Sequence, residues 1–489
     1  MKNQVHLIAY VDRLSGGGIS ALHSLLKGPL QGVFGGAHLL PFFDPIDGAD
    51  AGFDPIDHTR VDPRLGTWEN LRELTQTVDV MADLIVNHAS SRSRQFQDFS
   101  RYGASSAFGR MFLTMDRVFP DGATEAQLLK IYRPRPGLPF TYATLANGEK
   151  RLLWTTFTPE QVDLDVNDAK TQEYLSGILQ RFHEAGITSI RLDAAGYAIK
   201  KPGTSCFMIP ETFTFIDGLS QQAKALGIEV LVEIHSYYKQ QIEIARQVDL
   251  VYDFALPPLV LHALFSSDCE PLMKWLKIRP LNAITVLDTH DGIGVVDVGG
   301  DAQDNPGLLN PAQINALVET IHTRSNGESK QATGAAANNL DLYQVNCTYL
   351  DALGRDEALY LIARAIQFFV PGIPQVYYVG LLGSTNDLDL LARTGVGRDI
   401  NRHYFTAEEI QARLSSPLVN RLIELIRMRN SHPAFGGGCS FASSAQHLLE
   451  IDWRNDEHTA HLDVDLSKGQ ARLEFSGSAD RLPAHLQIG

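Results

Sequence analysis

Cysteine is scarce in this 489-residue sequence, and long apolar runs are missing from it. The four cysteines are Cys206, Cys269, Cys347 and Cys439, which lie far apart and form no CxxC pair. This spacing favours reduced thiols over a disulfide framework or a zinc site. The sequence has no apolar run of about 20 residues, the length that crosses a bilayer, and no signal-peptide pattern after Met1. We therefore expect a cytoplasmic protein that has no membrane contact.

Basic residues are in the minority. The sequence contains 42 Lys and Arg against 57 Asp and Glu, which gives a formal net charge of −15 at pH 7. Binding to a nucleic-acid backbone requires a clustered basic surface, so no nucleic-acid partner is expected. The composition, 44% hydrophobic and 20% charged, is typical of a globular protein. The length allows a large core and more than one structural unit.

Eight short apolar runs, rich in β-branched residues, recur along the chain between helical patterns. They are Val5–Asp12, Val33–Phe43, Val78–His88, Ile187–Ala194, Ile228–His235, Leu250–Leu256, Ala283–Asp291 and Ile373–Val379. Strands that alternate with helices are typical of a parallel α/β architecture, and eight of them match a closed barrel better than an open sheet. We therefore predict an α/β fold built on a (β/α)8 TIM barrel.

The intervals after the third and seventh runs are too long for a single crossover. Each leaves from the carboxyl end of a strand, the face on which barrels build active sites. We therefore expect two inserted loop-rich subdomains that shape a pocket, in preference to surface excursions without a function. Their predicted ranges are 87–167 and 292–355.

The chain after Gly436 changes its pattern. Apolar residues alternate there at period two, as in Leu449, Ile451 and Trp453, which predicts a small antiparallel β domain. The predicted division of the remaining chain is into barrel segments 1–86, 168–291 and 356–435 and a C-terminal β domain 436–489.

Four of the predicted strands end on titratable residues, which are expensive to bury without a partner. These ends are Asp83–His88, Arg191–Asp193, Glu233–His235 and Asp288–Asp291. For any one of them, a structural salt bridge or a solvated strand end is an equally good explanation. Because the carboxyl ends of barrel strands meet at one mouth, the four together indicate a shared site.

Two of these acids, Asp193 and Glu233, follow neighbouring predicted strands. Such strands lie about 4.8 Å apart. A retaining glycosidase needs two carboxyl groups about 5–5.5 Å apart, one as the nucleophile and one as the acid and then the base. Arg191 lies on the same strand face as Asp193 and can keep that carboxylate ionised. Burial and a nearby carboxylate favour a protonated acid near neutral pH. The pattern predicts retaining glycosyl transfer.

The four strand-end segments resemble the motifs of the α-amylase superfamily, in the same order on strands three, four, five and seven. The resemblance implies that Asp193 is the nucleophile, Glu233 the acid/base and Asp291 the stabiliser of the distorted glucosyl unit. It also implies that His88 and His290 hydrogen-bond the same unit.

A closer resemblance, to the sucrose phosphorylases, covers the chain from Met1 to about Phe435. It is carried by the phrases Leu40–Phe43, Gly48–His58, Tyr132–Phe140, Gly203–Met208, Gly334–Gln344 and Gly397–His403. It implies reversible phosphorolysis of sucrose to α-D-glucose 1-phosphate and D-fructose by a double displacement, with transglucosylation as a side activity. The implied partners are these small molecules, inorganic phosphate and other acceptors. A homodimer is compatible with the family.

The same resemblance implies neither a metal nor any other cofactor. Some α-amylase relatives bind calcium through an asparagine at the position of Asn87. A calcium ion takes about six to eight oxygen ligands, and one asparagine is weak support for such a site. We therefore predict no metal.

The resemblance also implies two sets of substrate-binding residues. For the glucose subsite these are Asp50, Phe53, His88, Phe157, Gln161, Arg191, Tyr197, His290 and Arg398. For the fructose and phosphate subsite these are Tyr132, Pro134, Arg135, His235, Leu340, Asp341, Tyr343 and Gln344. Asp50 and Arg398 resemble a pair that closes the pocket around a terminal glucosyl unit. Arg135 resembles the arginine that binds phosphate, which a guanidinium does in a bidentate manner.

Three alternatives remain open. Related phosphorylases of sucrose 6′-phosphate, glucosylglycerol or glucosylglycerate share nearly all of these motifs. Pro134 and Tyr343 are not basic, which favours unphosphorylated sucrose. A retaining α-glucosidase, a sucrose hydrolase or an isomerase would keep the same nucleophile without a phosphate site. A non-catalytic carbohydrate-binding relative would lose carboxylates that this sequence retains.

Overall fold

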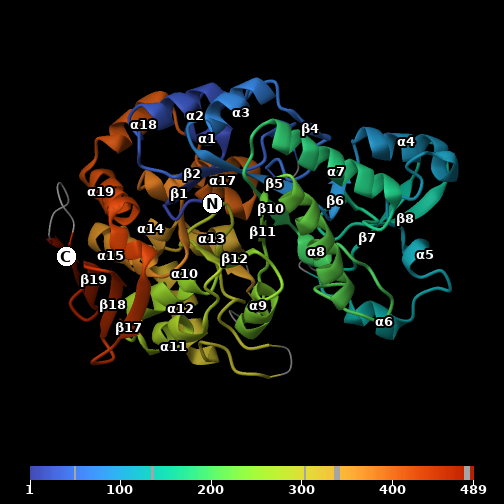
Figure 1. Ribbon diagram of the computed structural model, residues 1–489. Helices are drawn as coiled ribbons and strands as arrows, with labels where there is room; N and C mark the ends of the chain where they lie inside the picture. Colours follow the sequence, from blue (N-terminus) through green and yellow to red (C-terminus); the bar gives the residue numbers. More distant parts are fainter. Residues whose placement is uncertain (49–50, 134–136, 302–303, 335–341, 478–484) are drawn as a thin grey trace.

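A computed structural model describes residues 1–48, 51–133, 137–301, 304–334, 342–477 and 485–489 (Figure 1). Eight parallel strands form a closed barrel in the order β1-β16-β13-β12-β11-β10-β5-β2. Their bounds are β1 His6–Ala9, β2 Gly36–Leu39, β5 Asp79–Ile85, β10 Ser189–Asp193, β11 Glu229–Val232, β12 Leu250–Asp253, β13 Ala283–Thr285 and β16 Ile373–Tyr377. Each strand lies inside one of the eight predicted runs, so the predicted (β/α)8 TIM barrel is confirmed.

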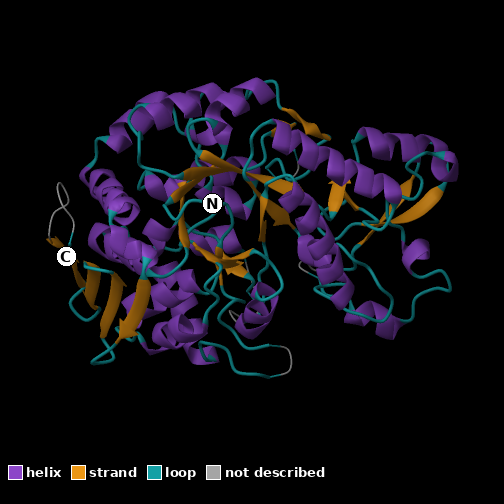
Figure 2. Ribbon diagram, in the orientation of Figure 1, coloured by secondary structure: helices purple, strands orange, loops and turns teal. Residues whose placement is uncertain are grey.

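Helices cover the outside of the barrel (Figure 2). The larger ones are α2 Gly18–Lys27, α3 Trp68–Thr75, α7 Ala169–Glu184, α8 Pro210–Ala225, α9 Tyr238–Ala245, α10 Leu256–Ser266, α11 Glu270–Ile278 and α15 Glu357–Phe369. Their starts follow local rules. The Asp168 side chain caps α7 by accepting a hydrogen bond from the Lys170 amide, and α8 has Pro210 in its first turn.

The barrel register brings the charged strand ends together. All residues of β1, β2 and β13 are buried, as expected for parallel strands that are covered on both faces. Arg191 of β10 lies beside Asp83 of β5 on one side and Leu231 of β11 on the other. The titratable residues of β5 and β10 therefore lie side by side at one end of the barrel.

The first insertion follows β5 and extends away from the barrel, to the right in Figure 1. Its elements are β6 His88–Ser90, α4 Arg94–Tyr102, α5 Met115–Val118, α6 Glu125–Lys130, β7 Phe140–Thr144, β8 Lys150–Trp154 and β9 Gln161–Asp163. It has apolar clusters of its own, one around Phe112 and another around Trp154. The antiparallel pairing of β6 with β9, with His88 opposite Asp163, returns the insertion to the barrel mouth.

The second insertion follows β13. Its elements are β14 Ile293–Gly294, α12 Pro311–Arg324, α13 Glu328–Thr333, β15 Gln344–Val345 and α14 Tyr349–Ala352. Asn310 and Gln313 form a capping box that starts α12. β14 pairs antiparallel with β15, which places Gln344 opposite Gly294. The pairing brings the end of the insertion back to its beginning. A further short pair, β3 Phe43–Asp44 with β4 Asp57–Val61, lies between β2 and β5 in the chain.

The last barrel strand is followed by the helices α16 Tyr378–Leu381, α17 Leu388–Thr394, α18 Ala407–Leu414 and α19 Pro417–Ser431, and then by a sheet. The sheet is antiparallel and five-stranded, with β17 Gly438–Ala442, β18 Leu448–Asn455, β19 His458–Asp465, β20 Gln470–Ser476 and β21 His485–Ile488. This confirms the predicted C-terminal β module. Leu449, Ile451 and Trp453 are buried, and the Trp453 indole donates a hydrogen bond to the Phe369 carbonyl at 2.7 Å.

The four cysteines are free thiols, three of them buried and Cys439 half-buried. Within the described residues, no helix is both long and apolar enough to cross a membrane.

Candidate active site

A cavity of about 900 Å³ opens at the carboxyl ends of the barrel strands. Both insertions contribute to its walls, and so does the segment Gly395–Arg398. The predicted site residues that line it are Phe53, His88, Phe157, Gln161, Arg191, Asp193, Tyr197, Glu233, His235, His290, Asp291, Tyr343, Gln344 and Arg398. Side chains that are far apart in the sequence are thus brought into one site.

Six further residues belong to the predicted site. Asp50, Pro134, Arg135, Leu340 and Asp341 lie outside the described residues. Tyr132 is described, and its ring stacks on Phe207 with 4.5 Å between ring centroids. Tyr132 is 37% exposed and is not a lining residue, but its ring also stacks on the lining residue Tyr197, with 6.1 Å between ring centroids. Phe207 is a lining residue that the sequence analysis missed.

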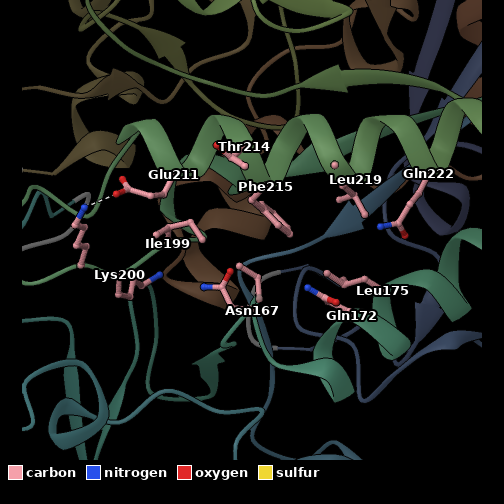
Figure 3. A pocket seen from close by; sticks show the side chains of 13 residues that line it. Asn167, Gln172, Leu175, Ile199, Lys200, Glu211, Thr214, Phe215, Leu219 and Gln222 are labelled. Carbon is pink, nitrogen blue, oxygen red and sulfur yellow. Dashed lines mark hydrogen bonds and ion pairs between the residues drawn. The ribbon is translucent and has the colours of Figure 1, made fainter.

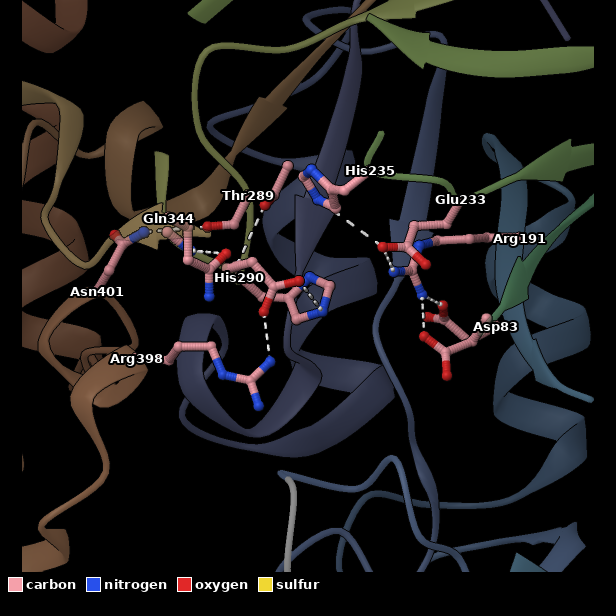
Figure 4. A network of polar contacts seen from close by, with 12 residues as sticks. Asp83, Arg191, Glu233, His235, Thr289, His290, Gln344, Arg398 and Asn401 are labelled. Atoms are coloured by element: carbon pink, nitrogen blue, oxygen red, sulfur yellow. Dashed lines mark hydrogen bonds and ion pairs between the residues drawn. The ribbon is translucent and has the colours of Figure 1, made fainter. Parts of the chain in front are cut away.

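The Arg191 guanidinium lies between Glu233 and Asp83 (Figure 4), and it contacts both carboxyl groups of the predicted catalytic pair. Arg191 Nη1 donates hydrogen bonds to Asp193 Oδ1, at 2.9 Å, and to Asp83. Its Nη2 lies 3.8 Å from Glu233 Oε1. Arg191 and Asp193 point the same way because side chains alternate along β10. Glu233 comes one residue after the end of the neighbouring strand β11.

The pair keeps a proton at neutral pH. Burial raises the pKa of Asp193 to about 8; Arg191 opposes this shift, and the Glu233 and Asp83 carboxylates add to it. The proton belongs to the two carboxyl groups jointly, since each charge disfavours the other. Asp193 accepts a hydrogen bond from Arg191, whereas Glu233 remains 3.8 Å away from that guanidinium. The Arg191 guanidinium therefore supports the charged form of Asp193 more directly than that of Glu233.

The third acid, Asp291, is ionised. Arg398 Nη1 donates a hydrogen bond to Asp291 Oδ1 at 2.6 Å, and Arg402 Nη2 lies 3.7 Å from the same oxygen. Burial disfavours the charge, but the His290 ring and the two guanidiniums lower the pKa of Asp291 well below its usual value. Burial and the cations Arg191 and Arg402 also lower the pKa of His290 well below its usual value, so the ring is neutral. The two arginines therefore account for the lowered pKa of Asp291.

Two other strand-end acids are structural. Asp83 is fully buried between Arg191 and His38, whose Nε2 lies 3.0 Å from Asp83 Oδ2. Burial raises the pKa of Asp83, but Arg191 and His38 outweigh it and lower the pKa to about 2. Asp288 pairs with the buried Arg364 at 2.6 Å. For these two acids, the salt-bridge explanation that the sequence left open is the right one.

The wall around the predicted glucose subsite is aromatic. Phe53 stacks on His290 with 4.9 Å between ring centroids. The rings of His88 and Phe157 meet edge-on with 5.5 Å between their centroids. The backbone carbonyl of Phe53 accepts hydrogen bonds from His88 Nε2 at 3.0 Å and from Gln161 Nε2 at 3.4 Å. This network fixes rings and an amide at the surface of the cavity, an arrangement that suits a sugar ring.

The other side of the carboxyl pair is formed by His235, Tyr343 and Gln344. His235 Nε2 lies 3.8 Å from Glu233 Oε1, and the Tyr343 ring meets the His235 ring edge-on at 5.3 Å. Gln344 Oε1 accepts a hydrogen bond from the Gly292 amide at 3.1 Å, which ties β15 to the residue just before β14.

Lys200, whose side chain is buried, belongs to the network and was missed by the sequence analysis. Its ammonium contacts Asp163 Oδ2 at 2.6 Å, Asn87 Oδ1 at 2.8 Å and the Tyr197 carbonyl. The oxygen atoms of Asn87 and Asp163 are thus engaged by a lysine and do not fit a calcium ion as well. Because Asp163 belongs to β9, the contact joins the first insertion to the turn that carries Tyr197. No motif spacing points to this lysine.

Within the described residues, one set of acidic and histidine side chains has ligand atoms close enough to surround a cation. Glu233, His235 and Asp291 place these atoms within 4.8 Å of one another. Arg191 and Arg398 contact the same set, and their positive charges oppose a metal ion. The set suits a sugar with an anionic acceptor better than a metal.

A second cavity, of about 500 Å³, lies between α7 and α8 (Figure 3). Its walls include Leu175 and Gln172 of α7, Phe215 and Leu219 of α8, and Lys200. It shares no lining residue with the larger cavity among the residues described, so it is separate from the carboxyl pair.

Comparisons with known proteins show which sequences and structures the chain resembles. The family model described as alpha amylase, catalytic domain, matches residues 33–243. A sucrose phosphorylase of Agrobacterium vitis is 62% identical over 98% of both chains. A sucrose phosphorylase of Bifidobacterium adolescentis is 52% identical over 98% of this chain and 97% of its own. The crystal structure of a sucrose 6F-phosphate phosphorylase from Thermoanaerobacter thermosaccharolyticum superimposes with a TM-score of 0.91, at 36% identity, over 100% of this chain and 98% of the other.

Proposed function

Because the chain belongs to the sucrose phosphorylase family, within the α-amylase type of barrel, we propose that it catalyses the reversible phosphorolysis of sucrose to α-D-glucose 1-phosphate and D-fructose. The observation that carries the proposal is the pair Asp193 and Glu233, joined by Arg191 in one cavity. One member of this pair is held as an anion and the other can hold a proton, which is what a retaining mechanism requires.

In the first step, the Asp193 carboxylate attacks C1 of the glucosyl unit. Glu233 donates its proton to the oxygen that leaves with fructose, and the bond between C1 and that oxygen breaks. The product is fructose and a glucosyl ester on Asp193. Arg191 supports this step because it stabilises the carboxylate form of Asp193 before the attack.

In the second step, a phosphate oxygen attacks C1 and the ester bond to Asp193 breaks. Glu233, now a carboxylate, takes up the proton that the attacking phosphate gives up. Asp193 leaves as a carboxylate, and the product is α-D-glucose 1-phosphate. Two inversions at C1 retain the α configuration. With an alcohol in place of phosphate, the same step transfers glucose to another acceptor.

Asp291 acts on the sugar in both steps. Its carboxylate is held by Arg398 and Arg402, and it faces the cavity that the catalytic pair shares. A fixed negative charge there stabilises the oxocarbenium-like transition state without reorganisation. The assignments of Asp50, Arg135 and Asp341 rest on the resemblance alone.

Unphosphorylated sucrose is the preferred donor in this proposal. Tyr343 and Gln344 present neutral side chains on the fructose side of the cavity. A phosphate on fructose would require a cation in that place. A sucrose hydrolase is the second candidate, since the carboxyl pair alone would serve it equally well.

The test is a product assay with purified protein, sucrose and inorganic phosphate. We expect glucose 1-phosphate and fructose in equal amounts, and no product from Asp193→Asn, which keeps the shape of the side chain and removes its charge. Free glucose without glucose 1-phosphate would assign the chain to the hydrolases. Parallel assays with sucrose 6′-phosphate, glucosylglycerol and glucosylglycerate rank the donors, and a faster reaction with any of them would replace sucrose.

The larger organisation is part of the same proposal. The segments 87–167 and 292–355 form inserted subdomains, and 436–489 is a separate β domain. The enzyme acts on small molecules in the cytoplasm, and it does so as a homodimer. Light scattering measures the mass of the dimer.

A further inference from the structure

The ring of His235 is fixed on three sides. Its Nδ1 lies 2.8 Å from Asp297 Oδ2. One face stacks on Phe254, with 3.7 Å between ring centroids and 10° between the ring planes. Tyr343 meets the ring edge-on at 5.3 Å. The ring cannot turn without breaking the contact with Asp297, so the direction of its other nitrogen is set.

Asp297 is a fully buried carboxylate between β14 and α12. Its Oδ1 accepts hydrogen bonds from the Ser236 amide at 3.2 Å and from Gln241 Nε2 at 2.6 Å, and its Oδ2 makes the contact with His235. A Cβ atom on Gly294 would lie only 2.2 Å from Asp297 Oδ2. The backbone of β14 therefore covers the carboxylate, and this close approach requires glycine.

Of the pair His235 and Asp297, only the histidine faces the cavity. His235 lines the cavity, with Nε2 at 3.8 Å from Glu233 Oε1, whereas Asp297 lies behind it and is not a lining residue. Two other cations among the described lining residues, Arg191 and Arg398, are hydrogen-bonded to the carboxylates of the catalytic site itself. His235 differs because its anionic partner is outside the cavity.

We propose that Asp297 is a positioning residue that holds His235 in its doubly protonated form, with Nε2–H directed at the acceptor side of Glu233, so that the glucosyl-enzyme reacts with anionic phosphate in preference to water. The inference rests on the proposed phosphorylase function and adds the group that selects the acceptor. Once fructose has left, Glu233 and Asp291 are both carboxylates and repel a phosphate anion. A charge-assisted hydrogen bond from His235 offsets this repulsion, and a water molecule gains little from it.

The charges around the ring support the doubly protonated form. Asp297 faces it from the second insertion, Glu233 from the end of β11 and Asp291 from the segment between β13 and β14. Phe254 and Tyr343 are uncharged neighbours. Burial lowers the pKa of His235, but the three carboxylates together raise it above its usual value.

Transfer to phosphate depends on pH through the charge of His235. The imidazolium is present below its raised pKa, so transfer to phosphate is lost as the pH rises through that value. In Asp297→Asn the neighbouring charge is gone and burial lowers the pKa. Transfer to phosphate is then lost at a lower pH, while the reaction with water keeps its own profile.

The experiment compares wild type, Asp297→Asn and Asp351→Asn with sucrose as donor. Asp351 is a matched control because it is a buried aspartate of the same insertion, paired with Arg355 and not among the cavity residues. The readouts are kcat/KM for phosphate from pH 5 to 9 and glucose release without phosphate. For Asp297→Asn at pH 7 we expect kcat/KM for phosphate to fall about 10- to 100-fold and glucose release to change less than about twofold. Asp351→Asn should keep the wild-type ratio.

A second measurement does not depend on any variant's folding. The imidazole of His235 in the wild-type enzyme is titrated by NMR after histidine-selective labelling, with His235→Gln used for assignment. A neutral ring at pH 7, or an unchanged ratio and pH limit in Asp297→Asn, overturns the inference. If wild type forms glucose but no glucose 1-phosphate, the proposed function itself has failed, which is a different result.

Discussion

Arg191 sets the charge balance of the catalytic cavity. Asp83, Asp193 and Glu233 all approach this one guanidinium, and the fully buried Asp83 keeps its charge with a pKa of about 2. One cation therefore serves two further carboxyl groups, and it cannot neutralise both. A proton makes up the difference, and it is this proton that the proposed mechanism delivers to fructose.

The raised pKa of Asp193, which reflects the proton that the carboxyl pair holds jointly, predicts how stability depends on pH. Its pKa is about 8 in the folded protein against an ordinary value of 3.8, so the folded state binds more protons than the unfolded state between these values. The free energy of unfolding therefore decreases as the pH rises from about 4 to about 8. Asp193→Asn removes this pH-dependent loss of stability. We expect its melting temperature to exceed that of wild type by a few degrees at pH 8 and by less at pH 4.5.

Calorimetry of both proteins at the two pH values checks this expectation. Asp44→Asn is a suitable control, because that carboxylate is partly exposed and its salt bridge with Arg60 is long, at 3.6 Å. An equal increase in the melting temperature of Asp193→Asn at both pH values would contradict the raised pKa of Asp193.

At the scale of elements, Lys200 joins the first insertion to the barrel. Its ammonium is almost fully buried against Asp163 of β9 and Asn87, next to His88 of β6. Lys200→Met leaves the Asp163 carboxylate buried without its cation, which costs about 3–5 kcal/mol. We expect a lower melting temperature, faster proteolysis within 87–167 and a raised KM for sucrose.

Lys201→Met is the matched control for this change. Lys201 is the next residue along the chain, but its side chain is 54% exposed and pairs with the exposed Glu211. Surface pairs of this kind contribute about 0–1 kcal/mol. Similar losses in the two variants would show that Lys200 has no special part in holding the insertion.

The sequence predicted the strands and the acids at their ends for a physical reason. A barrel strand is buried throughout, so its apolar run is visible, and an acid such as Asp193 stands out at its end. The Lys200 network and the Asp297–His235 pair could not be found in this way. Each joins residues 37 or more positions apart (163 with 200, 235 with 297), and neither has a fixed spacing. The sequence also did not distinguish structural from catalytic strand-end acids, because that depends on partners such as Arg364, which pairs with Asp288.

At the scale of the whole molecule, the C-terminal sheet completes the core of the barrel domain. Trp453 of β18 is 6% exposed and donates its indole hydrogen bond to the end of α15. Trp453→Ala leaves a cavity and an unpaired carbonyl, a change that costs about 3–5 kcal/mol. We expect the melting temperature to fall by several degrees while KM for sucrose stays at its wild-type value, because the site lies at the barrel mouth.

Thermal unfolding and initial rates measured on the same preparations check this separation. Tyr102→Ala, at a side chain that is 55% exposed, should leave both quantities unchanged. A changed KM in Trp453→Ala would mean that the sheet influences the cavity at a distance.

The lysine between the barrel and its first insertion also bears on the solution in which the molecule can work. An ammonium that is part of the chain cannot be dialysed out, captured by a chelator or precipitated as a phosphate salt. A calcium ion in that place would be exposed to all three. Concentrated inorganic phosphate, which sequesters calcium, is the second substrate of the proposed reaction. A joint held by Lys200 is therefore compatible with the very reagent that the enzyme consumes.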